Sequence, residues 1–183
     1  MTSAHWLDDA TWEAVRRAVP ITCVDLLPLR EAGDGTEIAL VQRATPFDAA
    51  LRWCHVGGRV RRDETLRAAL LRHLHETLAG VEVALPADPQ PDHVMQWFPD
   101  VVDRARDGVA YGWDPRQHAV ALCFAVELTG EPAPVPGGEA LRFGWFTTEA
   151  VAGMGDELWP GTAAVVEAVV RSRRGDTVRP APQ

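Results

Sequence analysis

The stretch that decides the fold is residues 57–80, which read GGRVRRDETLRAALLRHLHETLAG. Two glycines open it, a helix is expected from Asp63, and Gly80 is the expected stop. Apolar side chains repeat at helical spacing and form one stripe, made of Leu66, Ala69, Leu70, Leu74 and Leu78. The glycines let the backbone approach a metal or a phosphate closely. Side chains three or four residues apart share one helix face, so this segment predicts a loop followed by a helix that packs through one apolar face.

The pattern resembles the Nudix box, G-x5-E-x7-R-E-U-x-E-E-x-G-U, in which U is an apolar residue. Gly58, Glu64 and Arg72 fall at its spacing. Leu74 takes the apolar position, and Glu76 takes the first glutamate of the pair. The resemblance implies an α/β (α+β) fold, namely a Nudix-type α/β/α sandwich with a mixed central sheet, and it makes Glu64 a structural residue of the box.

The box is degenerate at three positions. His73 and Thr77 stand where the pattern has glutamates, and the closing glycine comes one residue late, at Gly80. In a Nudix box, clustered carboxylates hold Mg²⁺ beside a diphosphate, where the metal neutralises charge and helps to activate water. Only Glu76 remains of the carboxylates at positions 73, 76 and 77. A catalytically silent Nudix-fold protein that binds a ligand or regulates therefore stays an alternative to an enzyme.

Within the superfamily, the chain is most similar to the GDP-mannose mannosyl hydrolases, whose box is also altered and has a run like GGRVxxDETLxAAxxR. Here residues 57–72 read GGRVRRDETLRAALLR. The similarity extends to a D-x-x-x-H-x-V-x-L run at 114–122 and an aromatic-x-W-apolar-T run at 143–147. It implies a hydrolase of a nucleoside diphosphate linked to another moiety, with a nucleotide sugar favoured and Mg²⁺ (or Mn²⁺) as cofactor. A hydrolase of a non-nucleotide organic diphosphate is a further alternative.

The resemblance also assigns ligand-binding roles. Three arginines match the branch's nucleotide-sugar contacts, and forked guanidinium groups suit diphosphate oxygens; they are Arg43, Arg59 and Arg72. For Arg72 the competing interpretation is a salt bridge to Glu64 across the box. The metal ligands implied are the backbone carbonyl near Gly58 and the side chains of Glu76 and Glu139.

The candidate catalytic residues are His118 and Glu76. His118 matches a histidine of the branch at the mouth of a strand, where it would be a general base or a sugar contact. Ala140 stands where the branch carries its catalytic histidine, so mannosyl transfer to water lacks that group here. His55 lies just before the glycines and is a candidate for lining the site.

Outward from the box, the chain predicts one Nudix-like domain over residues 1–173 and a flexible tail over 174–183. An amphipathic helix is expected over 8–18, and the box covers 58–80. Apolar runs at 21–29, 37–43 and 119–128 predict strands, whereas 100–113 and the Pro/Gly-rich 129–138 predict loops.

Composition limits the function classes. The 183 residues suffice for one domain, and the 46% hydrophobic and 24% charged content is globular. The net charge is −8, and all 18 basic residues are arginine, which argues against general nucleic-acid or anionic-membrane binding. Any anion site must therefore be a local arginine cluster.

The N-terminus and the cysteines predict a cytoplasmic protein. Residues 1–12 lack the basic and apolar regions of a secretory signal, and no apolar run approaches the roughly 20 residues of a membrane helix. Three cysteines, none in a CxxC pair, are expected to be reduced. The branch forms dimers through its N-terminal region, so the resemblance implies a homodimer. Trp6 and Trp12 are large apolar groups that fit docking on a partner subunit, and packing on the chain's own core fits them equally well.

Overall fold

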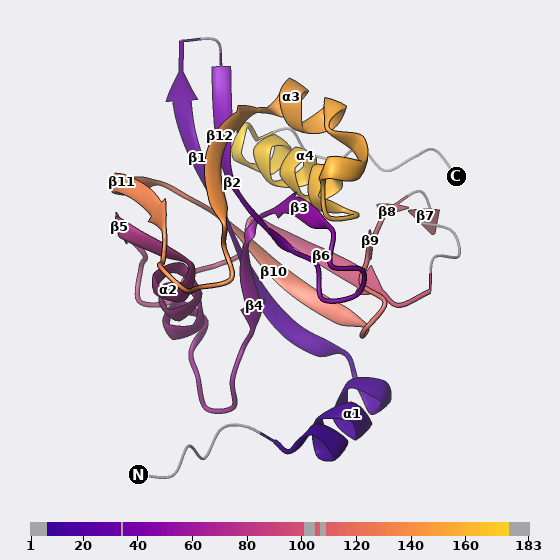
Figure 1. The fold of residues 1–183 in the computed structure, drawn as a ribbon. Coiled ribbons are helices and arrows are strands. Elements are labelled where there is room, and N and C mark those ends of the chain that lie inside the picture. Colours follow the sequence, from indigo (N-terminus) through magenta and orange to yellow (C-terminus); the bar gives the residue numbers. More distant parts are fainter. Residues whose placement is uncertain (1–6, 34, 101–104, 107–108, 176–183) are drawn as a thin grey trace.

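The structure is a computed structural model that describes residues 7–33, 35–100, 105–106 and 109–175. Its centre is a mixed sheet with the strand order β12-β2-β1-β10-β6-β9, in which β3 also pairs with β2 and β4 with β1 (Figure 1). The strands of this sheet are β1 (Ile21–Ala32), β2 (Gly35–Ala44), β3 (Leu51–Cys54), β4 (Val56–Arg59), β6 (His93–Phe98), β9 (Gly112–Trp113), β10 (Ala119–Val126) and β12 (Arg142–Thr147).

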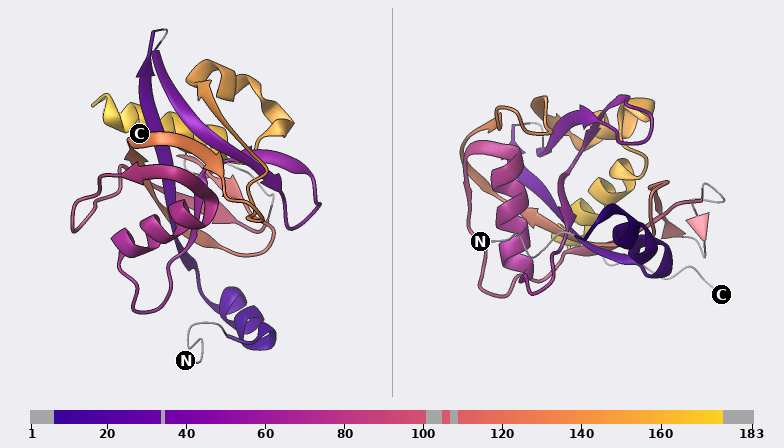
Figure 2. Two further views of the ribbon diagram at one scale, coloured as in Figure 1. Left: turned by 60° about the vertical axis from the view of Figure 1, so that its left-hand side comes forward. Right: turned by 60° about the horizontal axis from the view of Figure 1, so that its bottom comes forward.

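Two small ribbons and the helices complete the architecture. The ribbons pair β5 (Leu78–Val83) with β11 (Leu128–Pro134) and β7 (Ala105–Arg106) with β8 (Val109–Ala110). The helices are α1 (Asp9–Ala18), α2 (Leu66–Thr77), α3 (Thr148–Gly153) and α4 (Thr162–Arg173), with a short 3₁₀ helix at Gly155–Glu157. Because α2 packs on β1 and β4, while α4 packs on β10 and β6 from the other side (Figure 2), the predicted α/β/α sandwich with a mixed sheet is confirmed.

The centre of the sheet follows from two apolar runs. β1 and β10 pair in parallel along eight residues each, from Ile21 opposite Ala119 to Pro28 opposite Val126. A strand that is covered on both faces reads as a near-continuous apolar run, which is how both segments read. β4 pairs antiparallel with the other edge of β1, which places the glycines of the box against the most buried strand.

The box helix is shorter than the sequence pattern predicts. Thr65 is its N-cap and accepts a hydrogen bond from the Ala68 amide at 3.1 Å, so the helix begins at Leu66, whereas Asp63 lies in the preceding turn with φ 61°. The helix ends at Thr77, and β5 follows at once. Gly80 therefore does not stop the helix: it lies inside β5, with φ +74°.

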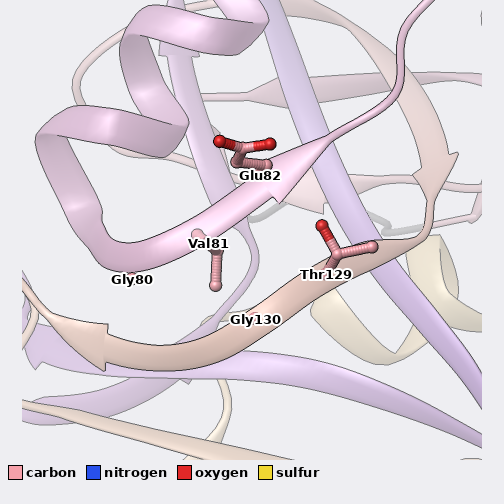
Figure 3. A pocket seen from close by; sticks show the side chains of 5 residues that line it. All are labelled: Gly80, Val81, Glu82, Thr129 and Gly130. Atoms are coloured by element: carbon pink, nitrogen blue, oxygen red, sulfur yellow. The ribbon is translucent and has the colours of Figure 1, made fainter.

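The predicted loops at 129–138 and 100–113 are also corrected. Most of the first is β11, and the second contains β7, β8 and β9 among its described residues. Pairing with β5 gives the backbone of β11 its hydrogen-bond partners, which composition could not reveal. Gly80 is needed there because a Cβ would lie 2.6 Å from the Glu131 carbonyl oxygen. A hollow beside the ribbon is lined by Gly80, Val81, Glu82, Thr129 and Gly130 (Figure 3).

The N-terminal helix lies at one end of the sheet and extends away from it (Figure 1). Asp8 caps α1 by accepting a hydrogen bond from the Thr11 amide at 3.0 Å, and α1 has no buried residue. Trp6 and the end of the predicted tail, 176–183, lie outside the described residues. Among the described helices, none is long and apolar enough to cross a membrane.

Candidate functional site

The two glycines of the box are fixed by close contacts on opposite faces of β4. A Cβ on Gly57 would lie 2.3 Å from Asp25 Oδ1 and 2.4 Å from the Val24 carbonyl oxygen. A Cβ on Gly58 would lie 2.6 Å from His73 Cε1 on α2. The first glycine thus lets a carboxylate approach the strand, and the second lets the box helix approach it.

Arg72 and Glu64 form the salt bridge that was the competing interpretation for Arg72. Arg72 Nε donates to Glu64 Oε1 and Arg72 Nη2 donates to Glu64 Oε2, each at 2.7 Å. Glu64 Oε2 also accepts from the Arg61 amide at 2.8 Å, which ties the loop to the helix. The bonds from Arg72 hold the pKa of Glu64 below its usual value, and Glu64 in turn raises the pKa of Arg72. The structural role of Glu64 is the one that this geometry supports.

The two side chains expected to bind a metal are each engaged by arginines. Glu76 lies 3.4 Å from Arg72 Nη1 and 3.6 Å from Arg61 Nη2, and Glu139 accepts a hydrogen bond from Arg43 Nη1 at 2.5 Å. No group of three or more His, Cys, Asp or Glu side chains in the described part of the chain is arranged to hold a metal ion.

The backbone carbonyl next to Gly58 also has hydrogen-bond partners already. The Arg59 carbonyl oxygen accepts from Arg72 Nη2 at 3.0 Å and lies 3.1 Å from His73 Nε2. Burial lowers the pKa of His73, so its imidazole is neutral near pH 7 and Nε2–H donates to this carbonyl. A magnesium site needs several free oxygen ligands. The donors that the box supplies do not fit the predicted metal cage in this arrangement.

Arg59 lies on the face of the sheet opposite the box helix, whereas the strand register places Arg43 on the other face. Arg59 pairs with Cys23 across β4 and β1, so its side chain shares a face with those of Cys23 and Asp25. Its guanidinium lies 3.9 Å above the ring of Trp12 on α1. The guanidinium of Arg43 lies 5.0 Å from the centre of the Trp159 ring. Arg72 is engaged by Glu64 within the box and also bonds to the Arg59 carbonyl oxygen.

A buried carboxylate–imidazole pair lies on the face of the sheet that carries Arg59. Asp25 Oδ2 and His55 Nε2 are 3.0 Å apart, and the two residues are only 5% and 9% exposed. His55 Nδ1 is buried and has no hydrogen-bond partner among the described residues. The sequence analysis named His55 but missed Asp25. The sequence held a signal for Asp25, because it is a charged residue within the mainly apolar run of residues 21–29.

His118 lies at the start of β10, two strands away from the box strand β4. Its ring stacks on Phe98, with the ring centres 4.6 Å apart, and its Nε2 is buried without a hydrogen-bond partner among the described residues. Its role as general base stays a prediction. Ala140 is buried, so the loop beside Glu139 offers an apolar side chain where the branch has a histidine.

Comparison with solved structures identifies the class to which this fold belongs. A possible asymmetric diadenosine tetraphosphate hydrolase from Jonesia denitrificans is 28% identical, with a TM-score of 0.72 over 88% of this chain and 99% of that chain. A MutT Nudix hydrolase from Burkholderia pseudomallei (21% identity, TM-score 0.56, 82% and 98% covered) shares the fold. So does the Nudix domain of Shewanella oneidensis NrtR, solved with ADP-ribose (19% identity, TM-score 0.57, 92% and 99% covered).

The chain therefore has the Nudix fold, and its neighbours support the expected Nudix-type hydrolase. At the level of sequence, residues 2–172 match a domain of unknown function, DUF4916, and the chain belongs to that family. The comparison with curated proteins gives no match.

Proposed function

We propose that the protein is a Nudix-type hydrolase of a nucleoside diphosphate linked to another moiety, with a nucleotide sugar as the favoured substrate. The observation that carries this proposal is the placement of Arg43 and Arg59, which are both half-buried and hold their guanidiniums against Trp159 and Trp12. The solved neighbours include one described as a diadenosine tetraphosphate hydrolase and one that binds ADP-ribose, and both ligands contain linked phosphates.

In this proposal the two arginines bind the phosphate oxygens. Guanidinium groups donate paired, charge-assisted hydrogen bonds that match phosphate geometry. Trp12 and Trp159 stack against these guanidiniums and restrict the directions in which they point. The Asp25–His55 pair lies on the face of Arg59 and gives it a buried polar group. We retain His118 and Glu76 as the catalytic candidates.

Magnesium dependence stays a prediction. Nudix hydrolases generally use a divalent metal such as Mg²⁺, which supplies charge neutralisation and an activated water. Here Glu76 and Glu139 would have to leave their arginine partners to bind it. We therefore derive no reaction step through a metal from the present arrangement.

A second candidate function is supported by the same observation. A Nudix-fold protein that binds a nucleotide derivative without cleaving it needs the arginines but not the carboxylate cage. The ion pairs of Glu76 and Glu139 favour this alternative. A cytoplasmic location and a homodimer also stay predictions.

Substrate turnover, measured together with binding, separates these functions. Wild type and Glu76→Gln would be incubated with GDP-mannose, ADP-ribose and a prenyl diphosphate, with Mg²⁺, Mn²⁺ or EDTA, and products separated by ion-exchange chromatography. Arg62→Gln is the matched control, because Arg62 is an exposed residue of the same loop. Metal-dependent cleavage of a nucleotide sugar that Glu76→Gln abolishes would support the hydrolase. Binding of GDP by calorimetry without any cleavage would support the second candidate.

A further inference from the structure

Arg72, the arginine that the sequence places third in the diphosphate site, has most of its donors engaged within the box. Its Nε and Nη2 both bond to Glu64, Nη2 also bonds to the Arg59 carbonyl oxygen, and Nη1 faces His73 and Glu76. A guanidinium has five N–H donors in a fixed planar fork, so its direction is set once one edge is bound to a carboxylate. Arg72 is held within the box.

A different arginine, Arg116, is held in a way that presents it to a ligand. It lies in the turn between β9 and β10, and the turn is fixed by Asp114, which is 6% exposed. Asp114 Oδ1 accepts from the Arg116 amide at 3.0 Å and from Arg116 Nε at 2.8 Å, while Oδ2 accepts from Nη2 at 2.6 Å. This two-point contact uses one edge of the guanidinium. Within the described part of the chain, Nη1 has no hydrogen-bond partner, and 36% of the side chain is exposed.

Arg116 converges with Arg43 on one aromatic ring. Their guanidiniums lie 5.5 and 5.0 Å from the centre of the Trp159 ring, although the three residues come from distant parts of the chain. Trp159 is itself buried and is braced edge-on by Phe47, with ring centres 5.2 Å apart. The buried indole limits the motion of both guanidiniums, because each makes a cation–π contact with it.

Arg116 is also close enough to Arg59 for their charges to interact. Burial lowers the pKa of Arg59, and the positive charge of Arg116 lowers it further, more than that of any other arginine. The thiol of Cys23, which pairs with Arg59 in the sheet, feels both arginines as well. Cations held near one another in a partly buried place are stabilised by a bound anion, since it offsets their mutual repulsion.

We propose that Arg116, positioned by Asp114, is the third arginine of a diphosphate-binding site that it forms with Arg43 and Arg59. This inference rests on the proposed function and deepens it. The ligand group is the diphosphate of a nucleotide derivative, bound by guanidinium donors on Trp159 and Trp12. Asp114 acts through Arg116 and is a positioning residue.

Calorimetric binding of GDP and of inorganic pyrophosphate tests the site. Wild type, Arg116→Gln, Asp114→Asn and the double variant would be titrated with each probe in EDTA and in Mg²⁺. The control is Arg142→Gln, because Arg142 also lies over a tryptophan, 5.7 Å from the Trp53 ring centre, but on the outer strand β12. Thermal unfolding of every variant would report on folding.

We expect Arg116→Gln to weaken both probes at least tenfold, from the loss of charge-assisted hydrogen bonds to phosphate. Asp114→Asn should weaken them less, and the double variant should be no weaker than Arg116→Gln alone, because Asp114 acts only through Arg116. Arg142→Gln should bind like wild type. If wild type binds the probes and Arg116→Gln binds them equally tightly, this inference is wrong while the proposed function stands. If wild type binds neither probe in either condition, both fail.

Discussion

The salt bridge between Glu64 and Arg72 should stabilise the whole box, and replacing Glu64 by glutamine tests that expectation. The side chains of Glu64 and Arg72 are only 13% and 16% exposed. Two hydrogen bonds of 2.7 Å join the two carboxylate oxygens to Nε and Nη2 of the guanidinium. Glutamine keeps the size of the side chain but removes the charge. It can accept from only one Arg72 donor and turns its amide towards the other, leaving a partly buried guanidinium without its counter-charge.

Glu64→Gln is expected to lower the free energy of unfolding by about 3 kcal/mol. This is the lower end of the range for breaking a buried ion pair, because Glu64 and Arg72 remain partly accessible to solvent. For a domain of this size, that corresponds to a fall of about 6–12 °C in Tm. The sign of the pH dependence follows from the lowered pKa of Glu64. The stabilisation is fully present above the unfolded-state pKa of about 4.3 and is lost as the pH falls through the folded-state pKa.

Urea denaturation followed by circular dichroism would measure the effect in wild type, Glu64→Gln, Arg72→Met and the double variant. A coupling energy of about 2 kcal/mol or more is expected from the double-mutant cycle, since the residues contact each other directly. A stability loss below about 0.5 kcal/mol for Glu64→Gln, or additive effects in the cycle, would refute the reasoning. Arg62→Gln should leave stability unchanged, because that side chain is 92% exposed.

Three further predictions follow from single residues. Gly57→Ala should lower the free energy of unfolding by about 3 kcal/mol in chemical denaturation, because its Cβ would lie 2.4 Å from the Val24 carbonyl oxygen. Gly153→Ala is the control and should be nearly neutral, because there is open space around Gly153. Equal effects of the two substitutions would contradict this prediction. Burial lowers the pKa of His73, so the neutral imidazole is favoured in the folded protein. The stability that this contributes is present above the unfolded-state pKa of about 6.5 and is lost as the pH falls below that value. The fall in Tm between about pH 7 and pH 5 should therefore be smaller in His73→Gln than in wild type. Light scattering should give a dimer of the 20.0 kDa chain that Trp12→Ala weakens, and a monomeric wild type would remove the dimer prediction.

The sequence by itself determined the parts of the fold whose pattern is local. The two glycines and the apolar stripe of residues 57–78 specify a loop and a packed helix, and the apolar runs of β1 and β10 specify buried strands. These features were readable because backbone sterics and helical or strand periodicity act over a few residues. The ends of the helix could not be predicted in the same way. Thr65 is a helix cap and Leu78 is a strand residue only because of the neighbours that the fold gives them.

Only the tertiary structure decided what each charged side chain does. Arg72 matches a ligand-binding position, yet it bonds to Glu64; Arg116 carries no motif, yet it lies with Arg43 at Trp159. Likewise, Arg43 and Glu139 form a pair across 96 residues of sequence. The physical reason is that spacing fixes the face on which a side chain lies, whereas the direction of a guanidinium or carboxylate depends on the partner that the fold brings within hydrogen-bonding distance.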